Sequence, residues 1–181
     1  MKSTAATSRN HPALKPVAIG LAGIAALTAS SWVSVPMYPV PVTMQTLVVL
    51  LLGALCGPRG GFAIVMAWLA LSLTGAPVLA GGKSGLVAFA GPTAGYLAAF
   101  PVAAFLAGLL PRSEELSAHA VRFGGFLALH VLILTAGSGW LSTFIGAEAA
   151  IMSGVMPFLI GALLKSALGA ALIAGFQQTT R

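Results

Sequence analysis

The chain is dominated by long runs of apolar residues, which are separated by short polar stretches or by stretches rich in proline and glycine. The runs lie near residues 17–35, 44–57, 60–74, 92–110, 121–137 and 148–176. A helix needs about 20 apolar residues to cross the hydrocarbon core of a bilayer. The pattern therefore predicts an all-α, polytopic membrane protein with six transmembrane helices in one domain, residues 17–177, between short tails at 1–16 and 178–181.

The stretches between the runs predict turns and loops at 35–43, 57–60, 75–91, 111–122 and 137–147. The runs 44–57 and 60–74 are short for spanning helices at about 1.5 Å per residue. The glycine-rich stretch 75–91 is too broken for a regular helix but too apolar for a solvated loop. Irregular backbone at membrane depth is tolerated where it lines a cavity. We therefore expect an outward-facing lid over a pocket between helices three and four, with an ordinary outer loop as the alternative.

Composition and charge narrow the class of protein. With 58% hydrophobic and 7% charged residues, the chain does not match a water-soluble domain. The net charge of +6 could indicate nucleic-acid binding, but the basic residues form no stripe or cluster. The single cysteine, Cys56, leaves no disulfide or thiolate metal site within one chain.

The basic residues instead predict the orientation, because Lys and Arg are enriched in cytoplasmic loops. With the N-terminus inside the cell, Lys83 is the one loop cation on the outer side. The cytoplasmic set is then Lys2, Arg9, Lys15, Arg59, Arg112, Arg122 and Arg181. We therefore expect a multi-pass membrane protein with both termini in the cytoplasm; a signal peptide is the alternative for the first run.

Lys165 lies within the last apolar run, with no acid nearby on the same helix. A cation in the membrane costs about 2.5 to 3.5 kcal/mol on insertion scales, which marks it as a functional candidate. Side chains lean toward the N-terminus of their helix, so Lys165 is expected to point toward the outward pocket. Snorkelling to the inner interface is the alternative. The three acids Glu114, Glu115 and Glu148 lie outside mid-membrane positions, which argues against a proton relay.

Two patterns suggest catalysis only weakly. Gly82-Lys83-Ser84 resembles the end of a phosphate-binding loop, but Pro77 stands where that motif needs glycine. Ser138 and His130 could form an intramembrane hydrolase, yet eight residues on one helix separate them by about 12 Å. We expect Ser138 to end a helix, His130 to pack inside it, and the chain to be no enzyme and to hold no cofactor.

The first run carries a stripe of small residues, Ala18, Ala22, Ala26 and Ser30, at every fourth position. Such a stripe allows another helix to approach closely. Two alternatives follow from it: packing within the bundle, and docking to a partner subunit.

Four ordered motifs together resemble the BioY family, the biotin-binding S components of energy-coupling factor transporters. They are the segments 35–46, 75–82 and 91–96, and Pro157-Phe158-Leu159 followed by Lys165. The resemblance implies a six-helix subunit of the bacterial cytoplasmic membrane that binds biotin for uptake. It also implies energising by a separate module of a transmembrane coupling protein and two ABC-type ATPases, which the alanine stripe would meet. A solitary oligomeric transporter, or an S component for another water-soluble vitamin, is the alternative.

The last motif departs from the family pattern Pro-Phe-x-Pro-Gly-Asp-x-x-Lys at two positions, since Ile160 replaces the second proline and Ala162 the aspartate. Biotin has an apolar bicycle, a ureido group and an anionic tail. A matching pocket needs apolar walls, a few polar groups and a cation. The predicted polar contacts come from Thr43, Gln45, Thr93, Tyr96 and the backbone of Gly81, Gly82 and Gly91. Trp68 and Phe89 are predicted as walls, and Lys165 as the cation, helped by Lys83.

Overall fold

The computed structural model describes residues 14–113 and 115–179. Lys2, Arg9, Glu114 and Arg181, with most of the two predicted tails, lie outside these residues. The elements are α1 (Leu14–Trp32), β1 (Ser34–Val35), β2 (Val42–Thr43), α2 (Gln45–Leu73), η1 (Ala80–Gly82), α3 (Gly85–Ala90), α4 (Ala94–Ala107), α5 (Leu116–Ile145), α6 (Ala147–Gly154), η2 (Met156–Phe158) and α7 (Leu159–Thr179).

Four helical stretches within the described residues are long and apolar enough to cross a membrane. They are Leu14–Trp32, Gln45–Leu73, Ser117–Ile145 and Ala147–Phe176, and the last of them runs through α6, η2 and α7. The apolar helix α4 is shorter. The mainly helical membrane fold expected from the apolar runs is therefore confirmed.

The predicted loop at 57–60 is a sharp bend inside α2. Gly57 has φ +79° and ψ 173°, a backbone conformation that favours glycine, and Pro58 follows it. The two arms of α2 then meet so closely that a Cβ on Gly61 would lie 2.5 Å from the Cα of Gly53. The bend thus joins runs 44–57 and 60–74 without a loop.

The turn predicted at 137–147 was wrong, because α5 continues through the Gly-Ser-Gly sequence to Ile145. Gly137 is required inside the helix since a side chain there would overlap the ring of Tyr96. The chain turns instead at Gly146, with φ +83°. At the other end, α5 begins within the predicted loop 111–122. Arg122 is therefore a buried helical residue that donates to the carbonyl oxygens of Ala118 and Ser113.

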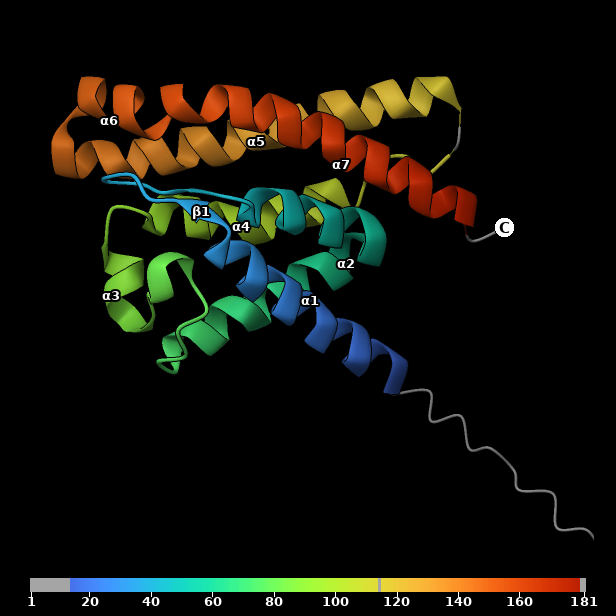
Figure 1. Cartoon of the computed structure of the whole chain (residues 1–181), viewed down its shortest axis with the longest axis horizontal. Helices are drawn as coiled ribbons and strands as arrows, with labels where there is room; N and C mark the ends of the chain where they lie inside the picture. The colour runs from blue at the N-terminus through green and yellow to red at the C-terminus, as the bar shows by residue number, and fades with distance from the viewer. Residues whose placement is uncertain (1–13, 114, 180–181) are drawn as a thin grey trace, which may run out of the picture.

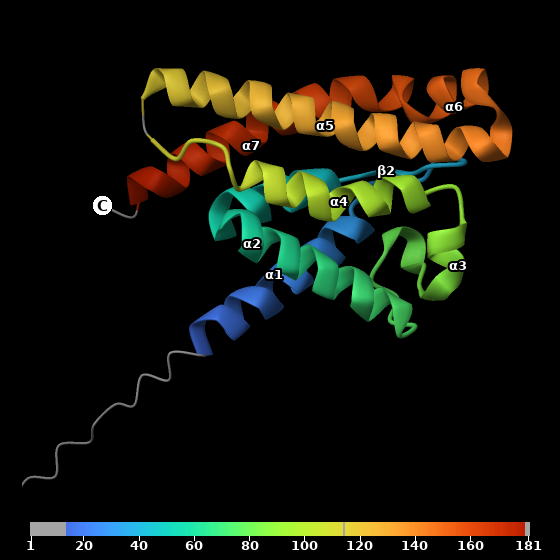
Figure 2. The ribbon, with the colours of Figure 1, turned by 180° about the vertical axis from the view of Figure 1, so that it is seen from behind.

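Helix α4 lies at the centre of the molecule, with α2 on one side and α5 on the other. Figures 1 and 2 show α5, α6 and α7 as one layer above α4 and α2, and α1 packs against α2. Small residues permit this close packing, because a Cβ on Gly53 would overlap the carbonyl oxygen of Ala104. The helices thus enclose one continuous apolar core.

Two connections cover one end of this bundle. The proline-rich turn at 35–43 is an antiparallel hairpin in which Ser34 pairs with Thr43 and Val35 with Val42. The stretch 75–91 is irregular as far as Lys83, and Gly75, Gly81 and Gly82 all have positive φ. The expectation that it holds no regular helix was wrong for 85–90, since five residues free of glycine allow α3 to form after Gly85.

The three alanines of the stripe on α1 face away from the bundle, whereas its fourth member, Ser30, is buried. Ala18, Ala22 and Ala26 are exposed, whereas the buried face of α1 consists of Gly23, Leu27, Ser30 and Ser31. Packing of the three alanines inside the bundle is therefore wrong, and docking to a partner stays a prediction.

Candidate binding cavity

A cavity lies between the first arm of α2, α4, α5 and α7, beneath the β-hairpin and the segment that precedes α3. Its space amounts to about 740 Å³, including the part that opens to the outside. The lining is mostly apolar, with a few polar side chains, as is usual in pockets for small organic ligands. The residues that line it are Val40, Pro41, Thr43, Gln45, Thr46, Leu79, Ala80, Lys83, Ala88, Thr93, Tyr96, Leu97, Phe100, His130, Ile133, Leu134, Phe158, Ala162 and Lys165.

Lys165 reaches this cavity from α7 and is 9% exposed. Its Nζ donates to the carbonyl oxygen of Thr43 over 2.9 Å and to Oγ1 of Thr46 over 3.1 Å. Both acceptors are neutral oxygen atoms, and neither Glu115 nor Glu148 lines the cavity. An ammonium has three N–H donors, so one remains after these two bonds. The lysine thus contributes a positive charge with a donor to spare.

Thr43 and Gln45 form a second polar group at the start of α2. The Thr43 hydroxyl donates to Oε1 of Gln45 over 3.1 Å, and Nε2 of Gln45 donates to Oγ of Ser31 over 2.6 Å. Gln45 is buried, and this bond ties α2 to α1 behind the cavity. A carboxamide has two N–H donors and two acceptor positions, so each end keeps one for a ligand.

Three more of the predicted residues line the cavity, each in a different way. Tyr96 presents its ring, while its hydroxyl donates to the carbonyl oxygen of Gly154 over 2.8 Å and so connects α4 to α6. Thr93 precedes α4 and Lys83 follows η1, and both line the cavity. The cavity therefore unites six of the predicted residues: Thr43, Gln45, Lys83, Thr93, Tyr96 and Lys165.

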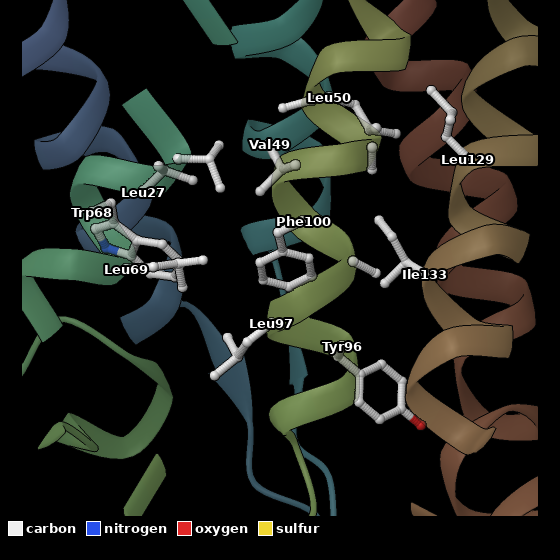
Figure 3. Close-up of a cluster of buried hydrophobic side chains, with 14 of the residues drawn as sticks. Leu27, Val49, Leu50, Trp68, Leu69, Tyr96, Leu97, Phe100, Leu129 and Ile133 are labelled. Atoms are coloured by element: carbon white, nitrogen blue, oxygen red, sulfur yellow. The ribbon is translucent and has the colours of Figure 1, made fainter. Parts of the chain in front are cut away.

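The other five predicted residues lie outside the lining. Trp68 is fully buried behind Phe100, with ring centroids 6.5 Å apart, and Figure 3 shows Phe100 between Trp68 and Ile133. Phe100, not Trp68, is thus the aromatic wall on this side. Phe89 packs against the core, Gly81 is exposed and Gly82 is half-buried. The carbonyl oxygen of Gly91 accepts a hydrogen bond from Nε1 of Trp140 over 2.9 Å.

Sequence reasoning missed two polar residues of the cavity, Thr46 and His130. His130 is buried, and its Nε2 lies 3.2 Å from Oγ1 of Thr46. It was expected to pack inside its helix, but it also faces the cavity. A polar side chain in the middle of a membrane helix is costly. The same argument that predicted Lys165 as a functional residue could therefore have predicted His130.

The pair proposed for a hydrolase does not form. The hydroxyl of Ser138 donates to the carbonyl oxygen of Thr135 over 3.3 Å, inside α5, while His130 contacts Ser166 and Thr46. A nucleophile and its base need to lie within hydrogen-bond reach of each other.

The apolar helices and the buried, mostly apolar cavity with its lysine define a polytopic membrane protein that binds a small molecule. The sequence pattern of the BioY family matches residues 2–181. The chain belongs to the BioY family.

Its relatives cover nearly the whole chain. A protein of Pyrococcus horikoshii named probable biotin transporter BioY is 33% identical over 166 residues, which cover 92% of this chain and 98% of the relative. The biotin transporter BioY of Thermotoga maritima is 35% identical over 155 residues, covering 83% of this chain and 88% of the relative. Since these relatives are transporters, the expectation that the chain is not an enzyme is confirmed.

A solved structure has the same fold. It is the crystal structure of the S-component for biotin from an ECF-type ABC transporter, which matches with a TM-score of 0.79 and 26% identity. The match covers 95% of both chains. The chain therefore has the overall fold of an S-component.

Proposed function

We propose that this protein is a membrane-embedded subunit that captures biotin for uptake. The observation that carries the proposal is the buried Lys165 at the wall of a mostly apolar cavity, in a chain of the BioY family. The related transporters and the biotin S-component support the same ligand. Biotin is then the transported ligand, and no cofactor takes part.

The cavity offers a group for each part of biotin. Phe100, Ile133 and Leu134 provide apolar surface for the bicycle. The free donor and acceptor of Gln45 match a ureido group, which itself donates and accepts hydrogen bonds. The remaining N–H of Lys165 fits the carboxylate, because a charged donor with a charged acceptor makes the stronger kind of hydrogen bond.

The six expected transmembrane helices are obtained if each arm of α2 spans the membrane separately and α4 spans it as well. This arrangement is supported by the bend at Gly57, after which the second arm of α2 runs back at an angle to the first (Figures 1 and 2). Together with α1, α5 and the α6–α7 stretch, the arms and α4 give the six-helix domain. The segment 75–91 then acts as the outward lid, with Lys83 above the cavity.

The placement of cations supports cytoplasmic termini in the bacterial cytoplasmic membrane. Lys15 lies in the first turn of α1, Arg59 follows the bend of α2, and Nε of Arg112 donates to the carbonyl oxygen of Ala54 near that bend. Figure 1 shows α3, which follows Lys83 in the sequence, at the opposite end of the molecule from the last turns of α7. By the excess of basic residues inside, the end with Lys15, Arg59 and Arg112 is cytoplasmic.

Energy for uptake comes from a separate module of a coupling protein and ABC-type ATPases. The exposed face of Ala18, Ala22 and Ala26 on α1 is the proposed contact, since small residues let a partner helix approach closely. The S-component relationship supports such a partner. A homo-oligomer working alone is the second candidate, and membrane lipid covers the remaining apolar surface.

Saturation binding of radiolabelled biotin to the detergent-purified protein tests this function. We expect saturable binding that excess unlabelled biotin displaces, while the same excess of thiamine or riboflavin does not. Absence of saturable binding by folded protein would refute biotin capture, and displacement by a different vitamin would identify the alternative ligand.

A further inference from the structure

His130 is an imidazole held inside the membrane-spanning helix α5 with only 3% of its surface exposed. Both of its ring nitrogens have partners. Nδ1 lies 2.9 Å from the carbonyl oxygen of Phe126 and 3.0 Å from Oγ of Ser166, and Nε2 lies 3.2 Å from Oγ1 of Thr46. These partners come from α5, α7 and α2, so the ring joins three of the helices that enclose the cavity.

The neighbours of His130 fix its tautomer. A carbonyl oxygen only accepts, so Nδ1 carries the hydrogen and donates to Phe126. The hydroxyl of Ser166 donates to the carbonyl oxygen of Ala162 over 2.7 Å, so its oxygen is also an acceptor for Nδ1. In a neutral imidazole the other nitrogen is then an acceptor. Nε2 therefore accepts from the hydroxyl of Thr46.

This bond fixes the direction of the Thr46 hydroxyl. A threonine hydroxyl has one hydrogen and two lone pairs. With the hydrogen directed at His130, the lone pairs are left for Nζ of Lys165, which donates to Oγ1 over 3.1 Å. The hydrogen bonds therefore run in one direction, from Lys165 to Thr46, from Thr46 to His130 and from His130 to Phe126. If the hydroxyl turned its hydrogen toward Lys165, it would oppose the ammonium.

We propose that His130 is a positioning residue for recognition of a carboxylate ligand: through Thr46 it holds the ammonium of Lys165 at the cavity wall. Two of the three N–H donors of Lys165 are then committed to Thr43 and Thr46, and the third is left for the ligand. This inference rests on the proposed function, in which Lys165 meets the carboxylate of biotin. It adds that the strength of this contact depends on a residue that need not touch the ligand.

The test compares biotin with biotin amide, which lacks the negative charge, in equilibrium binding to purified variants. The wild-type protein is expected to prefer biotin by about tenfold or more. Removal of the acceptor in His130→Leu should weaken biotin binding about fivefold and leave amide binding within about twofold. Thr46→Val, which keeps the shape of the side chain but lacks the hydroxyl, should likewise lose the preference for biotin over biotin amide. His130→Gln offers a carbonyl oxygen to the hydroxyl of Thr46 and should keep most of the wild-type preference for biotin.

Val131→Ala is the matched control, because Val131 is the next residue on α5, is exposed and does not line the cavity. It should keep the wild-type preference. Equal losses for both ligands in His130→Leu and Thr46→Val would overturn the inference, because they indicate only altered packing. An unchanged preference would overturn it as well. If His130→Leu does not fold, Thr46→Val carries the test. If the wild-type protein binds no biotin, the proposed function itself fails.

Discussion

Buried polar side chains in this protein connect helices and shape the cavity at the same time. Gln45 joins Ser31 on α1, Lys165 joins Thr43 and Thr46 near the start of α2, and Tyr96 on α4 joins Gly154 at the end of α6. Each bond satisfies a polar atom of a buried side chain, and leaving such an atom without a partner is costly. Substitutions at these residues therefore affect both stability and ligand affinity. Which of the two is affected more depends on whether the lost atom bonds to another part of the protein or faces the cavity.

Tyr96→Phe separates the two effects. The hydroxyl is committed to the carbonyl oxygen of Gly154, while the ring lines the cavity. We expect the free energy of unfolding to fall by about 1 to 2 kcal/mol, because a buried carbonyl loses its donor. Biotin affinity should stay within about threefold, since the ring remains. Thermal unfolding together with equilibrium binding checks this.

Tyr38→Phe is the control, because Tyr38 is 91% exposed on the hairpin and should tolerate the change. A large loss of affinity in Tyr96→Phe at unchanged stability would show that the hydroxyl serves the ligand instead of Gly154.

The sequence identified much of the cavity because charge and proline or glycine motifs stand out in apolar runs. Lys165 could be predicted from its cost in the membrane alone. Trp68 and Phe100 could not be told apart, because both are aromatic residues in apolar runs and only the packing places Phe100 in front. Gly81, Gly82 and Gly91 belong to the sequence motifs that supply other cavity residues, but none of these three glycines lines the cavity.

At the scale of the elements, glycine decides where helices bend and where they touch. Gly57 bends α2 through a positive φ, whereas Gly137 stays helical and makes room for Tyr96. A sequence pattern shows glycine in both places without showing which role it takes. This is why the bend near 57–60 could be predicted as a chain reversal, while the turn at 137–147 was placed too early.

Gly61→Ala should separate the two arms of α2. The new Cβ would lie 2.5 Å from the Cα of Gly53, which is backbone and cannot move aside as a side chain could. We expect a loss of about 1 to 3 kcal/mol in the free energy of unfolding, as for other overpacked sites. Thermal unfolding in detergent measures it.

Gly124→Ala serves as the control for this change, because Gly124 is in helix α5 and a Cβ there meets nothing within 4 Å. It should leave stability unchanged or slightly raised, since alanine favours helix more than glycine does. If both variants unfold alike, the close crossing of the arms is not what stabilises this part of the bundle.

At the scale of the whole molecule, we propose that the cavity lies near the outer face and that Lys15, Arg59 and Arg112 lie on the cytoplasmic side. A cavity near the outer face can collect its ligand from outside the cell, and the exposed α1 face is available to a coupling partner. This proposed orientation of the helices in the membrane rests on the distribution of Lys and Arg along the sequence.

Cysteine labelling in whole cells tests this orientation. Cys56 is the one cysteine of the chain, so Cys56→Ala gives a background without thiols. Ala147→Cys, at the exposed turn between α5 and α6, should react with a membrane-impermeant maleimide in intact cells. Ser113→Cys, in the exposed α4–α5 connection, should react only after the membrane is permeabilised. The reverse pattern would place the termini outside.

The most direct test of the account is the affinity of Lys165→Met for biotin, measured by equilibrium binding on purified protein. Methionine keeps the length of the side chain and removes its charge, and Lys15→Met, at an exposed position in α1, is the control. We predict at least a tenfold loss of affinity for Lys165→Met, about 1.4 kcal/mol, and none for the control. Wild-type affinity in Lys165→Met would contradict the account, because biotin would then bind without the one cation buried against the cavity wall among the described residues.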